Sequence, residues 1–232
     1  MKKLSKWIIG GIVLVAIFFL ASEGLNYYLK GPKMPINAIL VSGKSEDINE
    51  AKEVYKDNTK YTKEYKYKMV VKEETNIADN GEEVTITNKQ MLITKNTVKE
   101  MIKDQIFREK ASENSDIKTE LLTEMPNIDS DKNIILGSDY EKTVSEVNIN
   151  GVNIPVVYGC YSWIGYVPSD SYKIIVDDST YESIDGEELE MSLIRLKKSK
   201  LDLRNVKDQM AVKSEISDIS EDIDVNFAII KD

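Results

Sequence analysis

The N-terminal segment is the feature that most restricts what this chain can be. Residues 7–21 are all apolar or glycine, and Lys2, Lys3 and Lys6 precede them. A basic start followed by an apolar run is typical of a targeting segment. We therefore expect residues 1–30 to form a signal or transmembrane helix outside the folded domain.

Two fates are open for this helix. The apolar run is short for a membrane span, which needs about 20 residues. However, Trp7 and the pair Tyr27 and Tyr28 would lie roughly 30 Å apart on a helix, like the aromatic belts of a span. Cleavage would occur near Gly24, because Ser22-Glu23-Gly24 places small residues at both required positions. We expect a retained anchor through residues 7–28, with secretion after cleavage as the alternative.

Both fates place the rest of the chain outside the cytoplasm. Lys2, Lys3 and Lys6 hold the N-terminus on the cytoplasmic side by the positive-inside rule. We expect a single-pass protein of the cell membrane with an extracytoplasmic C-terminal domain. The expected partners are the membrane and an envelope protein.

Charge and composition argue against several functions. Residues 1–30 carry +3 of a total net charge of −9, so the remaining residues carry −12. An acidic domain is unsuited to binding nucleic acid, which requires clustered Lys and Arg. The chain has no histidine, the commonest general base and transition-metal ligand. We expect no nucleic-acid partner, no metal, no cofactor and no enzymatic activity.

The remaining chain is expected to form one domain behind a short linker. Residues 31–36 contain two prolines and a glycine and predict the linker. Residues 37–232 would be the extracytoplasmic domain, with a sub-boundary near residues 108–117.

Short apolar stretches alternate with helical patterns in this domain. Turn signals at Asp79-Asn80-Gly81 and Asn150-Gly151 predict hairpins, the second with a type I′ turn. Hairpins require antiparallel pairing, so the expected class is α+β with a mixed, largely antiparallel sheet and several short helices. Strands are expected at residues 38–41, 65–71, 84–87, 91–93, 134–136, 174–176, 189–196 and 225–230. Helical faces are expected from Ile48, Ala51, Val54 and Tyr55 (with Ser45 as N-cap), from Val98, Met101, Ile102 and Ile106, and from Leu203, Val206 and Met210.

Four segments repeat one pattern, an apolar triplet followed by a polar residue and a helix start. They begin at Ile39, Met91, Ile134 and Ile174. Their spacing is too irregular for a solenoid or a propeller. Two similar αβ halves would explain the pattern, and so would ordinary helix capping, because Ser, Thr and Asp are the residues that helix starts require.

Several polar residues are candidates for chemistry. Asp177 and Asp178 follow an apolar strand, where adjacent acids can do acid–base work, but they can equally cap the next helix. Residues 129–133 begin like a calcium loop, but Ile134 and Tyr140 stand where it needs Gly and Glu, which favours a solvated turn. Cys160 has no basic residue near it in sequence and is interpreted as a small buried hydrophobe.

The most distinctive stretch is aromatic. Five aromatic residues fall within residues 158–172: Tyr158, Tyr161, Trp163, Tyr166 and Tyr172. Tyr and Trp have an apolar body and a polar edge, which suits contact with partners, sugars or peptides. They can also complete a core. We take these five residues as the candidate contact site and leave the core alternative open.

The segment from Tyr172 to Ile184 contains the run Ile-Ile-Val-Asp-Asp and resembles segments of two known groups of proteins. It resembles uncharacterised lipoproteins of low-GC Gram-positive bacteria, which share a signal segment, an early strand and a similar later stretch. It is also similar, locally, to the extracytoplasmic domain of bacitracin-type ABC-transporter permeases. Glu23 stands where a lipoprotein would have its lipidated cysteine. Neither resemblance implies catalytic residues.

The expected function is a membrane-anchored, non-enzymatic binding or accessory module. Its partner would be an envelope protein, a peptide or a cell-wall ligand. The alternatives are a carboxylate-based envelope hydrolase using Asp177 or Asp178, and a purely structural surface protein.

Overall fold

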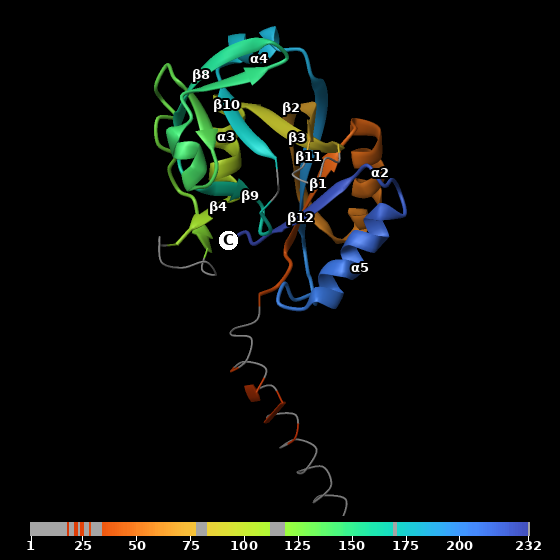
Figure 1. Ribbon diagram of the computed structural model, residues 1–232. Helices are drawn as coiled ribbons and strands as arrows, with labels where there is room; N and C mark the ends of the chain where they lie inside the picture. Colours follow the sequence, from red (N-terminus) through yellow and green to blue (C-terminus); the bar gives the residue numbers. More distant parts are fainter. Residues whose placement is uncertain are drawn as a thin grey trace, which may run out of the picture.

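Figure 1 shows the computed structural model of the chain. The structure describes residues 34–77, 83–111, 119–168 and 171–231, together with residues 18, 21, 22, 24, 25 and 28. Most of the expected anchor and the turn at Asp79-Asn80-Gly81 lie outside the described residues. Within the described ranges, no helix combines the length and the apolar character needed to cross a membrane.

The main sheet has nine strands in the order β12-β1-β11-β2-β3-β10-β6-β8-β7. Neighbouring strands are antiparallel except in the pairs β3–β10 and β6–β8, which are parallel. The strands are β1 (Ala38–Gly43), β2 (Thr59–Ile77), β3 (Glu83–Thr94), β6 (Asn133–Leu136), β7 (Glu146–Ile149), β8 (Val152–Tyr158), β10 (Tyr172–Val176), β11 (Glu187–Leu196) and β12 (Asp224–Ala228). The predicted α+β class with a mixed sheet is confirmed.

A second, smaller sheet and several helices complete the domain. The small sheet has the order β5-β4-β9, formed by β5 (Thr119–Leu121), β4 (Phe107–Lys110) and β9 (Ser162–Ile164). The α-helices of the domain are α2 (Ser45–Tyr55), α3 (Lys95–Lys103), α4 (Asp178–Ser183) and α5 (Val206–Ser217), and the short 3₁₀ helices are η1 (Lys56–Asn58) and η2 (Asp139–Thr143). Strands β4 and β5 pair with each other across residues 112–118, which lie outside the described residues. The predicted sub-boundary near residues 108–117 stays a prediction.

Both faces of the main sheet are covered, and strand alternation explains how. In β1, Ala38 and Leu40 belong to one core cluster, together with residues of α3 and of the small sheet. Ile39 and Val41 point to the other face, into a cluster with residues of α2 and α5. Figure 1 shows α2 and α5 together on one side of the sheet and α3 with β4 on the other. Helix α4 covers the second face further along, through Tyr181.

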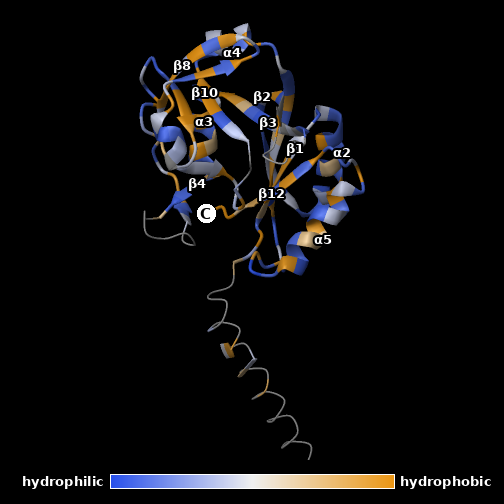
Figure 2. Ribbon diagram, viewed as in Figure 1, coloured by the Kyte–Doolittle hydropathy of each residue, from blue (hydrophilic) through white to orange (hydrophobic). Residues whose placement is uncertain are grey.

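Hydropathy follows this layering. Strand β10 is buried on both faces from Lys173 to Val176 and ends in a run of hydrophobic residues, whereas α2 and α5 alternate hydrophobic and hydrophilic positions (Figure 2). A strand buried on both faces has no polar alternation, but a helix on the surface needs only one apolar stripe. The apolar triplets of the sequence therefore mark strands that are buried on both faces of the sheet.

The four repeated segments are all strand ends followed by helices. Strand β1 leads to α2, β3 to α3, β6 to η2 and β10 to α4. Side chains of Thr94, Ser138 and Asp177 accept a backbone hydrogen bond at the start of α3, η2 and α4. Helix capping explains the polar residue that follows the apolar triplet in three of the four segments. The division of the domain into two similar αβ halves stays a prediction.

Some local expectations differ from the structure. Lys44, and not Ser45, is the N-cap of α2, and the Ser45 hydroxyl donates to Glu190 instead. Helix α5 buries Val212 and Ile216, while Val206 and Met210 are exposed. The expected buried face was wrong because it was counted from Leu203 at helical spacing. Leu203 is buried, but it lies before the first residue of α5.

The described end of the expected linker packs onto the domain. Ile36 is fully buried in the core cluster that also holds Leu203, and Met34 packs against that cluster. Pro35 forms an isolated β-bridge with Asp202. Residues 34–36 thus form a junction fixed to the domain, which we call the 34–36 junction.

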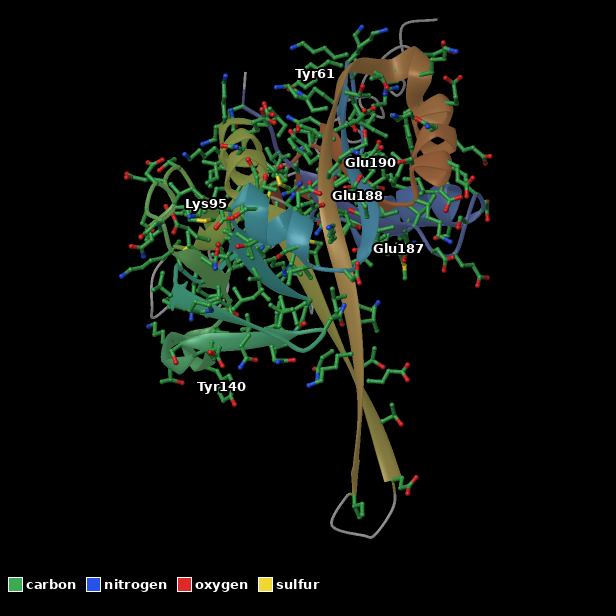
Figure 3. All side chains as sticks on the ribbon, turned by 90° about the horizontal axis from the view of Figure 1, so that it is seen from above. Tyr61, Lys95, Tyr140, Glu187, Glu188 and Glu190 are labelled. Carbon is green, nitrogen blue, oxygen red and sulfur yellow. The ribbon has the colours of Figure 1, made fainter. Side chains whose placement is uncertain are left out.

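Strands β2 and β3 extend beyond the rest of the sheet. Their pairing runs to Ile77 and Glu83, but β11 pairs with β2 only as far as Met69, and β10 pairs with β3 only from Gln90. Figure 3 shows the two strands projecting as a narrow ribbon. We call residues 71–77 and 83–89 the β-arm.

The predicted type I′ turn is confirmed. Asn150 and Gly151 join β7 to β8 with φ values of 50° and 83°. Both residues of a type I′ turn have positive φ, which explains the Asn-Gly pair.

Replacing Gly151 with Ala should destabilise the fold by about 1 kcal/mol, because a Cβ opposes positive φ and the smaller entropy of the unfolded chain offsets only part of that cost. The free energy of unfolding can be measured by urea titration of the detergent-solubilised chain. Gly43→Ala is the matched control, since a Cβ there would meet atoms no nearer than 3.6 Å. Equal losses in both variants would contradict a role of the turn conformation.

Candidate functional site

The candidate site lies on one face of the small sheet. On the central strand β4, Arg108 pairs with Trp163 of β9 and with Leu121 of β5. Paired residues project to the same face of a sheet. The adjacent pair, Phe107 and Ile164, projects to the opposite face and is buried in the main core. Arg108 and Trp163 therefore lie on the face turned away from that core.

Aromatic rings and cations meet on this outer face. The rings of Tyr161 and Trp163 are in edge contact, with centroids 5.8 Å apart and planes at 64°. Lys110 Nζ lies 5.9 Å from the centroid of Tyr161, and the guanidinium carbon of Arg108 lies 5.5 Å from the centroid of Tyr166. Cations at such distances are attracted to the ring face. We call these five residues the aromatic–basic face.

Arg108 is a half-buried cation on this face. Its Nε and one terminal nitrogen donate to the Thr119 hydroxyl and carbonyl oxygens, each at 2.9 Å. No ion pair joins it to a carboxylate among the described residues. Burial lowers the pKa of Arg108, an effect that Tyr166 partly opposes. The nearby acids Glu109 and Glu120 stand opposite each other in the β4–β5 register, and they project from the other face of the small sheet.

Trp163 lies beneath Tyr161. Its side chain is 6% exposed, and its indole nitrogen has no acceptor among the described residues. The face therefore offers positive charge and hydrogen-bond donors without a facing carboxylate from β4 or β5. Such a surface can hold an anionic group, which accepts hydrogen bonds and balances a desolvated cation.

The structure separates the five predicted aromatic residues. Tyr161, Trp163 and Tyr166 lie on the aromatic–basic face. Tyr158 lies elsewhere, at the end of β8, and its hydroxyl donates to the carbonyl of Gly137 at 3.2 Å. Tyr172 begins β10, where it pairs with Gln90 and is 39% exposed.

Sequence reasoning missed Arg108 and Lys110. The alternation of residues 107–110 predicts a strand with both cations on one side, which is a usable signal. However, the pairing of that strand with Trp163 joins residues far apart in the chain. No local pattern shows that contact.

Cys160 packs partly against the main core, in agreement with a structural interpretation. Its Sγ donates to the Ser162 hydroxyl at 3.3 Å. Burial raises the pKa of the Cys160 thiol above its ordinary value. A raised pKa keeps the thiol protonated and disfavours nucleophilic chemistry.

The Asp177 carboxylate caps α4. It accepts hydrogen bonds from Ser179 Oγ at 2.6 Å, from the backbone N–H of Thr180 at 2.8 Å and from Thr180 Oγ1 at 3.2 Å. These bonds lower the pKa of Asp177. Asp178 is exposed and accepts from Asn96 Nδ2 at 3.3 Å. The geometry favours capping over acid–base chemistry for this pair.

No cluster suited to a metal ion is found among the described His, Cys, Asp and Glu residues. Residues 129–133 lie mostly in exposed turns, as expected, and Asp129 forms an ion pair with Lys99 at 2.6 Å.

The 34–36 junction is held by a carboxylate. Asp202 Oδ1 accepts from the backbone N–H of Met34 at 3.1 Å. The backbone bonds Ile36 N to Leu201 O (3.0 Å) and Leu203 N to Met34 O (2.7 Å) complete a short ladder. Arg204 also donates to Asp202, and these bonds lower the pKa of Asp202 far below its ordinary value. A depression of about 340 Å³ adjoins the ladder, lined by Pro35, Ser199, Lys200, Leu201 and Asp202.

Replacing Asp177 with Ala should cost about 1 kcal/mol of unfolding free energy, the usual loss for a helix cap. Because the folded pKa is lowered, the stabilisation is present above about pH 4, the ordinary Asp range, and is lost as the pH falls through the lower folded pKa. Urea titrations at several pH values test this. Asp178→Ala is the control and should lose less than half as much. If the two variants lose equal stability, the capping role is refuted.

Replacing Asp202 with Ala should loosen the 34–36 junction. Loss of a hydrogen bond to a charged acceptor should speed amide exchange at Met34 by about tenfold or more. Hydrogen exchange read by NMR measures this, and tryptic cleavage after Lys33 should accelerate as well. Asp185→Ala, an exposed acid, is the control. Unchanged exchange at Met34 would show that the backbone ladder holds the junction without Asp202.

Comparison with known proteins agrees with the lipoprotein resemblance. No curated protein matches the sequence. The fold is similar to the crystal structure of a "putative lipoprotein from Bacillus anthracis", with a TM-score of 0.62 and 17% identity, covering 84% of this chain and 99% of that chain. At that identity the likeness shows the fold alone. Residues 36–226 match the sequence profile of an uncharacterised lipoprotein family, and because this match spans most of the chain, the protein belongs to that family.

Proposed function

We propose that the protein is a membrane-tethered, extracytoplasmic and non-enzymatic module, whose aromatic–basic face contacts an anionic component of the cell envelope. The single observation that carries this proposal is the position of that face. Tyr166 packs with Arg108 and also contacts the 34–36 junction, where its hydroxyl lies 3.8 Å from the Met34 sulfur. The contact surface therefore adjoins the point where the chain arrives from its N-terminal segment.

The tether in this proposal is the apolar segment itself. A lipid anchor needs a cysteine thiol near the end of the signal segment, but Cys160 is the only cysteine and belongs to the domain. Glu23 stands at the position where the thiol is needed. Residues 7–21 then supply the membrane attachment that the family's lipoproteins obtain from lipid. Retention of the segment is favoured over cleavage near Gly24 by Trp7 and the pair Tyr27 and Tyr28, which resemble the aromatic belts at the two ends of a membrane span.

Membrane fractionation tests the tether. The wild-type chain should stay with membranes after carbonate washing, and N-terminal sequencing should begin at residue 1 or 2. Val13→Arg should release it or prevent insertion, because a central Arg costs about 3 kcal/mol in an inserted helix. Val13→Leu is the control. Protein that accumulates in the medium and begins at Leu25 would show cleavage and would refute the retained anchor.

A further inference from the structure

The aromatic–basic face carries an electrostatic imbalance. The domain is strongly acidic, with −12 outside residues 1–30. Even so, the half-buried Arg108 has no carboxylate partner among the described residues, and its hydrogen bonds go to the neutral groups of Thr119. Lys110 stands on the same face, beside Tyr161. A desolvated cation without counter-charge is costly unless an outside anion completes the site.

The position of the face limits where that anion comes from. Met34 is in contact with Tyr166, and Tyr166 with Arg108. Tyr28, which we expect at the membrane interface, is only six residues before Met34. Six residues span about 20 Å when fully extended. Met34 therefore lies within about 20 Å of the bilayer surface wherever the N-terminal segment is inserted, and the aromatic–basic face adjoins Met34 through Tyr166.

The chemistry of the face matches that surface. Tyr and Trp collect at the headgroup level of membranes, and Arg and Lys are attracted by anionic lipids. A domain of net negative charge is repelled by an anionic bilayer, so it can approach only through a face that turns cations outward. On β4 and β5 the acids Glu109 and Glu120 project to the other side. The small sheet therefore turns Arg108 and Lys110, and not these two acids, toward the aromatic–basic face.

Resting on the tether proposed above, we infer that the aromatic–basic face docks on the anionic phospholipid headgroups of the membrane that anchors the chain. Arg108 and Lys110 meet the phosphate oxygens, and Tyr161, which is 40% exposed, lies at the level of the glycerol groups. Trp163 sits just beneath this contact. The docked domain holds a fixed orientation on the bilayer, with α2 on the side away from the small sheet (Figure 1).

Trp163 supplies the reporter for a test. The chain has two tryptophans, so Trp7→Phe leaves Trp163 as the only one. This full-length variant is reconstituted into vesicles of phosphatidylcholine, with or without phosphatidylglycerol, that carry a nitroxide on a fraction of the headgroups. Flotation first shows whether the chain is attached, and quenching of Trp163 fluorescence then reports docking.

Docking predicts quenching in phosphatidylglycerol vesicles at low salt, and its loss in pure phosphatidylcholine or at high salt. Adding Arg108→Gln should lower the ratio of docked to undocked domain about fivefold, the effect of one basic residue near an anionic surface. Lys44→Gln removes an exposed charge from the start of α2 and should change nothing. The salt dependence needs no substitution on β4, so it decides the question even if Arg108→Gln disturbs the fold.

Three results would overturn the inference. The first is a chain that floats with phosphatidylglycerol vesicles but shows no quenching. The second is equal quenching in both lipids. The third is a shift of Trp163 emission by soluble poly(glycerol phosphate) in detergent without any quenching in vesicles, which would assign the face to a wall polymer. A chain that does not float at all would instead refute the tether, so the two failures are distinguishable.

Discussion

The fold depends on a sheet whose central strands are buried on both faces. Alternating residues of β1, β3, β6 and β10 enter different core clusters, so each strand holds helices or a second sheet on both sides. Long antiparallel pairing fixes the register, with β2 held between β11 and β3. A slip of one residue would exchange the two faces of every strand. The position of the small sheet, and of everything on it, follows from this register.

The candidate site is a consequence of that layering. Phe107 and Ile164 anchor the small sheet to one face of the main sheet, and strand alternation then turns Arg108 and Trp163 outward. The 34–36 junction reaches the same region because Ile36 enters the cluster on the other face, while Met34 meets Tyr166. The positions of the 34–36 junction and of the aromatic–basic face are thus set by one packing arrangement. Neither could shift without disturbing the core.

Local chemistry made much of the fold predictable. Apolar triplets predicted β1, β6 and β10, positive φ at Asn150 and Gly151 followed from their residue types, and the cap at Asp177 followed from its place before a helix. Long-range pairing was not predictable, because nothing near Trp163 shows that β4 lies beside it. The aromatic stretch therefore contributes only partly to the candidate site: Tyr161, Trp163 and Tyr166 lie beside the cations, while Tyr158 and Tyr172 belong to other strands. The buried face of α5 was also predicted wrongly, because Leu203 is part of the core but lies before the start of the helix.

The β-arm has a thermodynamic consequence. Past Met69 and before Gln90, the two strands pair only with each other among the described residues, and Val71 and Ile77 are 52% and 75% exposed. A two-stranded ribbon in water has little stability of its own. The arm can therefore open and close as a separate cooperative unit at a fraction of the free energy needed to unfold the domain. Its strands are a region of the molecule where backbone groups become accessible to another chain without any loss of the core.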